Sequence, residues 1–383
     1  MILRIVLACL CVLAIQKSFA QGVVADTASM VASSVPSFAS DSTMAHVGVS
    51  RPKRKFWQRL VKIVRAFSSI DTSYIEPQHY NYTVMLQNTN TFEVYHLRNK
   101  EGHEYTFSPN PSYKLGPYIG WRWIFLGYTI DLTNLSMSSK RQDLNLSLYS
   151  NQVGIDLYFR KSGDNYRINK IYLGKGFDTS AMKDVDFNDF HSSIKGFNFY
   201  YIFNHRKFSY PAAYSQSTIQ KRSVGSAIAG FGYTKHSLDV DWKALREIAA
   251  ERLGPGKSLN TLDSSLVFSN INYTSYNISG GYAYNWVPLR NCLFDVSFQA
   301  CLAYKRAVNQ VKSTSSNIFR DFDFRNINID GVGRTAFVWN NGRWYAGASA
   351  VWQFVTYRKE QFNTNNLFGN VNFYVGFNFG RKR

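Results

Sequence analysis

The chain has 383 residues, enough for one large β domain or two ordinary domains. It carries 44 Lys and Arg against 25 Asp and Glu, a net charge of +19, and 16% of its residues are aromatic. This composition fits a nucleic-acid-binding protein or an outer-membrane β-barrel. No run after the N-terminal leader reaches the roughly 18 apolar residues of a transmembrane helix, which excludes a helical membrane protein.

Residues 1–20 predict a secretory signal peptide. Arg4 precedes an apolar run over residues 5–15, and the sequence Ser18-Phe19-Ala20 predicts cleavage after Ala20. The apolar run is too short to cross a bilayer. Export argues against a nucleic-acid partner and leaves the outer-membrane class.

Residues 21–50 predict a flexible linker, because they are rich in Ser, Ala, Thr and Val and have no periodic pattern. Residues 51–69 predict a basic amphipathic helix on the periplasmic side, since apolar and cationic residues separate at 100° per residue. A barrel domain is expected over residues 70–383. The helix residues that we expect to act at a membrane surface or as a plug are Arg51, Lys53, Arg54, Lys55, Phe56, Trp57, Arg59, Leu60, Lys62, Val64, Arg65 and Phe67.

This helix has two alternative placements. It lies flat on the inner leaflet of the outer membrane, with its apolar face in lipid and its cations among anionic headgroups. Alternatively, it folds against the barrel opening and plugs it. We favour the flat placement.

From Tyr80 onward the hydrophobic pattern alternates with a period of two, which predicts half-buried strands. Many alternating stretches reach roughly nine to fifteen residues, a length that suits tilted membrane strands. One to three strands are expected within residues 80–115. Other expected strands lie near residues 121–132, 141–149, 152–161, 165–173, 195–205, 325–339, 343–357 and 366–379.

Long and short connections alternate along the C-terminal half. The three residues NNG at 340–342 join the expected strands 325–339 and 343–357. The connection NWVPLRN at 285–291 is also short. The connection at about 306–324 is long, and so is the one at about 238–266, which includes the helical pattern DWKALREIAAERLG. Short periplasmic turns and long extracellular loops are typical of outer-membrane barrels. We therefore predict an all-β fold, a transmembrane antiparallel β-barrel of about 12 strands within a range of roughly 10 to 14.

Aromatic and cationic residues flank these connections. Trp286, Trp339 and Trp344 lie at the short turns, where a periplasmic aromatic girdle is expected. A second set, expected to line a cationic lumen or rim that favours anionic solutes or lipopolysaccharide, is Arg122, Lys305, Arg306 and Arg343.

Cys292 and Cys301 fall in one expected strand. Their odd separation places them on opposite faces, and nine steps of about 3.3 Å put them roughly 30 Å apart. We expect two free thiols and no disulfide.

Three stretches resemble a Bacteroidota outer-membrane family known as a domain of unknown function (4421). They are IDTSYIEPQHYNYTVMLQNTN at 70–90, YKLGPYIGWRWIFLGYTIDL at 113–132 and FSYPAAYSQSTIQKRSVGS at 208–226. The resemblance runs from about residue 70 to the C-terminus. It implies secretion and an outer-membrane barrel body, and it supplies no catalytic residues.

No metal-ligand spacing occurs among the seven His residues, so neither a metal nor a cofactor is expected. The expected partners are outer-membrane lipids, lipopolysaccharide and the barrel insertion machinery. The main hypothesis is a pore or a structural or binding component without enzymatic activity. One alternative is a lipid or lipopolysaccharide hydrolase, whose candidate residues are His205, Ser209, Ser215 and Ser217. The other is a soluble periplasmic β protein that the basic helix attaches to the membrane.

Overall fold

The structure, a computed structural model, describes residues 70–121, 124–127, 130–132, 142–162, 165–253, 270–307, 323–358 and 362–382. The chain divides into two compact units, Met1–Ser69 and Ile70–Arg383, and the described residues all belong to the second. The predicted signal peptide, linker and basic helix therefore lie outside the described residues, and so does Arg122.

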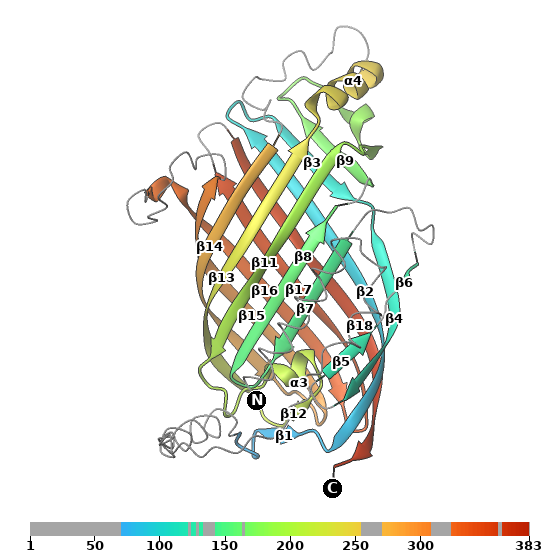
Figure 1. The fold of residues 1–383 in the computed structure, drawn as a ribbon, viewed down its shortest axis with the longest axis vertical. Helices are drawn as coiled ribbons and strands as arrows, with labels where there is room; N and C mark the ends of the chain where they lie inside the picture. Colours follow the sequence, from blue (N-terminus) through green and yellow to red (C-terminus); the bar gives the residue numbers. More distant parts are fainter. Residues whose placement is uncertain are drawn as a thin grey trace, which may run out of the picture. The chain divides into compact units, whose positions relative to one another are not determined.

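The second unit is an antiparallel sheet that curls into a barrel (Figure 1). Sixteen strands of the described chain belong to this sheet. The C-terminal strand β18 (Phe362–Arg381) pairs with β2 (Tyr80–Asn99), which joins the two ends of the unit. The other flank of β2 pairs with β4 (Ser112–Trp121). The remaining long strands are β7 (Gln142–Tyr149), β8 (Val153–Lys161), β11 (Phe190–Ile202), β13 (Val224–Val240), β14 (Asn270–Trp286), β15 (Cys292–Ala307), β16 (Ile327–Asn340) and β17 (Trp344–Arg358).

The number of barrel strands agrees with the prediction. Strands β5 (Ile124–Gly127) and β6 (Ile130–Asp131) both pair with β4, so they continue one strand. Three short strands, β3, β9 and β10, extend the sheet at one end. With β5 and β6 counted together and the extension set aside, twelve strands of the described chain remain.

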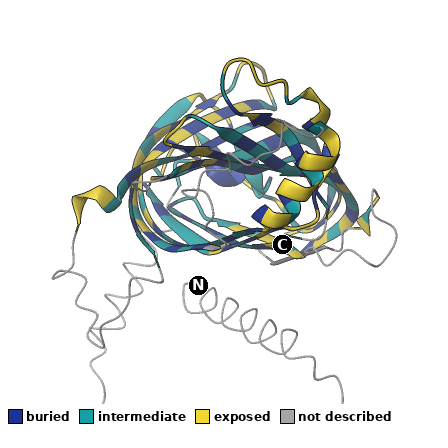
Figure 2. Ribbon diagram, turned by 90° about the horizontal axis from the view of Figure 1, so that it is seen from above, coloured by how far each residue is buried: buried dark blue, intermediate teal, exposed yellow. Residues whose placement is uncertain are grey.

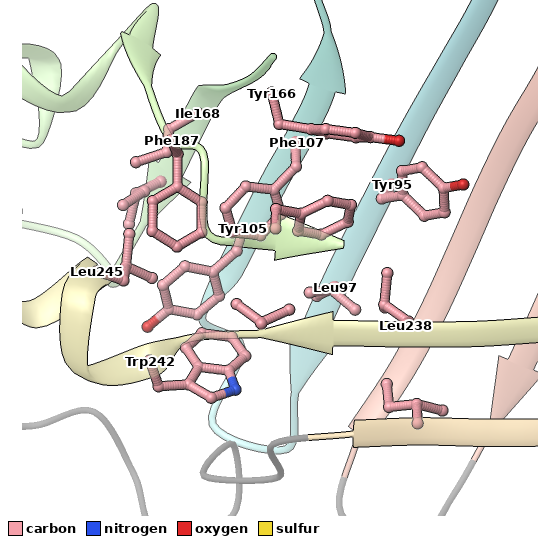
Figure 3. Packing of buried hydrophobic residues seen from close by; sticks show 14 of the residues in the cluster. Tyr95, Leu97, Tyr105, Phe107, Tyr166, Ile168, Phe187, Leu238, Trp242 and Leu245 are labelled. Carbon is pink, nitrogen blue, oxygen red and sulfur yellow. The ribbon is translucent and has the colours of Figure 1, made fainter. Parts of the chain in front are cut away.

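The loop end of the barrel, where the long connections emerge, carries an apolar cluster. Strands β3 (Glu104–Pro109), β9 (Tyr166–Tyr172) and β10 (Val185–Asp186) meet the 3-10 helix η1 (Ser180–Met182) and helix α4 (Trp242–Leu253) there. Figure 2 shows α4 above the ring of strands. Figure 3 shows the buried aromatic and aliphatic side chains that pack beneath it. The helical pattern in the long loop is thus confirmed.

The turn end, at the opposite end of the strands, has short connections. Gly342 has a φ of +90° in the turn between β16 and β17, a conformation that favours glycine. Helix α3 (Tyr210–Tyr214) and the paired strands β1 (Ile75–Pro77) and β12 (Thr218–Gln220) also lie at this end (Figure 1). Pro211 suits the first turn of α3, and the side chain of Ser209 caps its N-terminus.

Several strand boundaries differ from the sequence-based expectation. Strand β17 ends at Arg358 and β18 begins at Phe362, so the connection is shorter than the one expected between residues 357 and 366. The segment around Thr364 and Asn366 is polar, which suggested a loop. These two side chains are buried, because a barrel strand can direct polar groups to the interior.

The alternation predicted for the strands is present in their burial. In β15, for example, Phe294 and Phe298 are exposed, whereas Asp295 and Gln299 are buried. Outward-facing positions are free of Asp, Glu, Lys and Arg across a wide band of the described strands. The band comprises the outward positions of residues 82–94 in β2, 197–203 in β11, 227–233 in β13, 276–286 in β14, 292–304 in β15, 327–339 in β16, 344–356 in β17 and 365–379 in β18.

None of the helices in the described part of the chain has the length and hydropathy needed to cross a membrane.

Candidate functional site

The middle of the barrel interior is crossed by a buried ion pair. Arg334 on β16 donates from Nη2 to Asp156 Oδ2 on β8 at 2.5 Å. Four strands separate β16 from β8 along the sheet, so the pair bridges opposite walls. Arg334 is only 1% exposed, and its guanidinium carbon lies 4.8 Å from the ring centroid of Tyr200. This contact and the ion pair cross the interior at mid-height.

A second buried ion pair lies on the same wall as Arg334. Lys305 on β15 contacts Asp330 on β16 at 2.7 Å and also donates to the carbonyl oxygen of Thr356. The side chain of Lys305 is fully buried. Its charge is therefore matched within the protein.

Helix α3 enters the interior at the turn end. The hydroxyl of Tyr214 donates to Asp295 Oδ1, and Gln216 Nε2 donates to the hydroxyl of Tyr374 at 2.7 Å. Burial, followed by the nearby carboxylate of Asp295, raises the pKa of Tyr214 well above its ordinary value. The phenol therefore stays protonated and remains a donor. These bonds tie α3 and the residues after it to β15 and β18.

Aromatic residues cross the interior towards the loop end. The hydroxyl of Tyr95 on β2 donates to Ser192 Oγ on β11 at 3.0 Å. The rings of Tyr273 on β14 and Tyr357 on β17 stack with centroids 4.2 Å apart. Side chains therefore cross the interior at three heights: at α3, at the Arg334–Asp156 ion pair and at the stacked tyrosines.

A cavity of about 360 Å³ remains between these contacts. One wall is charged: Asp143 lies 3.3 Å from both Lys114 and Arg160, and Arg160 lies 3.8 Å from Glu93. The Nε and Nη1 atoms of Arg160 have no hydrogen-bond partner within the described chain. The facing wall is neutral and is lined by Gln87, Thr89, Thr91, Ser349, Gln353, Asn370 and Asn372. Such a cavity suits a small polar molecule, because it offers both charged and neutral hydrogen-bonding groups.

The interior contains acids and bases in comparable numbers. The buried or half-buried carboxylates at inward positions include Glu93, Asp143, Asp156, Asp295 and Asp330. The cations among them include Lys114, Arg160, Lys305 and Arg334. Since most of these groups form ion pairs with one another, the described interior gives no preference for anions.

The family described as Domain of unknown function (DUF4421) matches residues 69–379. The chain belongs to this family. A search of curated proteins finds no match.

Solved structures similar to the DUF4421 domain include three barrels. The outer membrane protease OmpT from Escherichia coli is 7% identical, with a TM-score of 0.31, and the match covers 78% of this chain and 97% of OmpT. The translocator domain of the autotransporter NalP from Neisseria meningitidis is 12% identical, with a TM-score of 0.27 and coverage of 85% and 95%. The toluene transporter TodX from P. putida is 8% identical, with a TM-score of 0.20 and coverage of 79% and 91%. At these scores we draw no functional argument from the three proteins.

The predicted girdle residues of the DUF4421 domain lie at the turn end and point outward. Trp286, Trp339 and Trp344 are 52%, 40% and 50% exposed. The ring centroid of Trp344 lies 4.5 Å from that of Phe377. Their role at a membrane interface stays a prediction.

The predicted cationic residues do not gather at one site. Lys305 points inward and is paired, whereas Arg306 is half-buried at the loop end of β15. Arg343 is exposed in the β16–β17 turn, with its guanidinium 5.1 Å from the ring centroid of Phe377. Arg122 lies outside the described residues.

The candidate hydrolase residues have structural contacts. Ser209 is fully buried, caps α3 and bonds to Thr218 Oγ1 at 2.7 Å. Ser215 bonds to the carbonyl oxygen of Pro211 and to Ser217. No hydrogen bond joins His205 to any of the three serines within the described residues.

Two further features concern ligands and thiols. No group of three or more His, Cys, Asp or Glu in the described residues is arranged to hold a metal ion. Cys292 is half-buried and Cys301 is buried, and both are free, as predicted.

The interior ion pairs were missed at the sequence level. Asp156 lies within QVGIDLYF and Arg334 within GVGRTAFVW, each a charge in an otherwise apolar strand. A charged residue in an otherwise apolar barrel strand indicates an inward position, because barrel interiors are polar. Its partner could not be identified, since β8 and β16 are far apart in the sequence.

Tyr214→Phe is expected to lower the free energy of unfolding by about 1–3 kcal/mol, because it leaves the buried Asp295 carboxylate without its donor. Urea unfolding of the refolded barrel, followed by tryptophan fluorescence, measures the change. Tyr210→Phe in the same helix is the control, since the Asp295 carboxylate accepts its hydrogen bond from Tyr214 and not from Tyr210. Equal losses in the two variants would show that the bond to Asp295 contributes nothing specific.

Proposed function

We propose that this protein is a closed β-barrel of the bacterial outer membrane that acts as a binding or structural component, without an open pore and without enzymatic activity. Export by the predicted signal peptide and insertion by the barrel insertion machinery are part of this proposal. So are its contacts with outer-membrane lipids and lipopolysaccharide.

The uncharged outward band supports placement in a membrane. A lipid-facing charge is costly near the bilayer midplane, so a barrel that spans a membrane excludes charges from that face. The exposed apolar residues of the band include Phe231 at 53%, Ile278 at 64% and Phe298 at 55%. A soluble barrel would leave these side chains in water. The band therefore favours an integral barrel over a periplasmic protein attached by its basic helix.

The buried pair Arg334–Asp156 is the observation on which the closed state rests. It bridges opposite walls, with α3 below it and the stacked Tyr273 and Tyr357 above it. An aqueous channel needs a continuous path, and each of these layers obstructs one. The cavity beside Arg160 is suited to a bound polar molecule.

The contacts of the candidate serines disfavour hydrolysis. Ser209 is buried as a helix cap, and a nucleophile requires a nearby base and access to substrate. We therefore propose no catalytic role for the segment around α3.

Purified protein reconstituted in a planar bilayer is expected to give no stable conductance steps at moderate voltage. An open porin reconstituted in parallel shows that insertion is detected. Carbonate extraction and heat-modifiable gel mobility of the same sample test membrane integration separately. Regular steps from the folded protein would overturn the closed state, and release by carbonate would overturn the integral barrel.

A further inference from the structure

Two lysines face one another on the outer surface near the loop end. The pairing of β11 with β13 sets Lys195 directly opposite Lys235. Lys235 is in turn opposite Thr274 on β14, which is opposite Arg306 on β15. These four residues form a continuous row of hydrogen-bond donors across four neighbouring strands, which we call the cation row.

The cation row lies at the loop-end edge of the uncharged band. Aromatic residues occupy the next outward positions towards the turn end, with Phe197 opposite Tyr233 and Tyr233 opposite Tyr276. Lys195 is eight positions from Phe203, and Lys235 is eight positions from Ala227, both near the turn end. Since a tilted strand crosses the hydrocarbon region in about 9–11 residues, the lysines fall near the opposite interface.

Opposed lysines repel one another unless an anion lies between them. Like charges directly opposite on neighbouring strands are destabilising. Neither Lys195 nor Lys235 has an ion-pair partner among the described residues. Asp239 on the same face of β13 is four residues further towards the loop end than Lys235. The arrangement therefore calls for a counter-charge from outside the protein.

We propose that Lys195 and Lys235 bind the phosphate group of a phosphorylated lipid in the outer leaflet. Two ammonium groups chelate the phosphate, and the Thr274 hydroxyl and Arg306 extend the site along the row. The acyl chains of the same lipid lie along the uncharged band, against the exposed side chains of Phe231 and Ile278. The apolar surface directly beneath the cations selects a lipid over a soluble anion. This site rests on the membrane placement proposed above.

The test uses Lys195→Gln/Lys235→Gln in the full-length protein. The control variant, Lys175→Gln/Lys183→Gln, removes the same charge from exposed positions at the loop end. Native mass spectrometry in a mild detergent measures binding of phosphorylated lipid A and of its dephosphorylated form. The double variant is expected to bind phosphorylated lipid A roughly 25-fold more weakly, at about fivefold per lysine, and the control to bind as the wild type does.

Three outcomes would overturn the site: unchanged binding by the double variant, equal weakening by the control, or equal binding of dephosphorylated lipid A by the wild type. Displacement of the lipid by inorganic phosphate at equal concentration would also overturn it, because a soluble anion would then suffice. Carbonate extraction of both variants tells this failure apart from failure of the membrane placement. If the double variant stays in the membrane and binds the lipid normally, the lysine site is contradicted and the membrane placement is not.

Discussion

Arg334→Ala is expected to lower the free energy of unfolding by about 3–5 kcal/mol, because it leaves the buried Asp156 carboxylate without its counter-ion. The substitution also removes the guanidinium from the face of Tyr200. Urea unfolding of the refolded protein, followed by tryptophan fluorescence, measures the loss. The exposed Arg343 supplies the control, and Arg343→Ala should change stability by less than about 1 kcal/mol.

A double-mutant cycle separates the ion pair from other effects of the substitution. Arg334→Met with Asp156→Leu replaces both charges by apolar groups and leaves no unpaired charge. We expect this double variant to be more stable than either single variant, Arg334→Met or Asp156→Leu. Additive losses would show that the two side chains are not coupled, and the bridge across the interior would then have no energetic role.

Phe298→Arg is expected to destabilise the membrane-inserted barrel by about 2–4 kcal/mol. Phe298 is 55% exposed and lies midway along the uncharged outward positions of β15. If those positions contact hydrocarbon, an arginine there loses its hydration or distorts the bilayer. Unfolding from lipid vesicles is the measurement, with loss of heat-modifiable mobility as a second readout.

The matched control places the same side chain outside the band. Leu289 is 69% exposed in the short turn between β14 and β15, where an arginine remains in water. Leu289→Arg should therefore leave stability within about 0.5 kcal/mol of the wild type. Equal tolerance of arginine at both positions would mean that the outward face of β15 does not contact lipid.

The ion pairs of the interior change the interpretation of the charge excess. The sequence-based hypothesis placed Lys305 and Arg306 in a lumen or rim that favours anions. Lys305 is instead neutralised by Asp330, and the described interior holds acids and bases in similar numbers. The outward cation row beside Lys235 is a better candidate for meeting anions, because no carboxylate of the described chain pairs with its two lysines.

Local patterns were sufficient for most of the fold. The period of two predicted the long strands, because the side chains of a strand alternate between its two faces. The NNG turn and the helix in the long loop were also recognised, since turn and helix propensities act over a few residues. The start of β18 was missed because inward polar residues such as Asn366 resemble a loop when the interior is assumed to be apolar.

By itself the sequence determined most of the strands, their approximate number and the family. Only the tertiary structure decided which interior side chains meet. Asp156 and Arg334 are 178 residues apart in the sequence, and no local pattern links them. The curl of the sheet and the register of each strand pair bring them together, and the register of β11 on β13 sets Lys195 opposite Lys235. Pairing across a barrel depends on register, and a shift of one residue would turn each of these side chains to the other face.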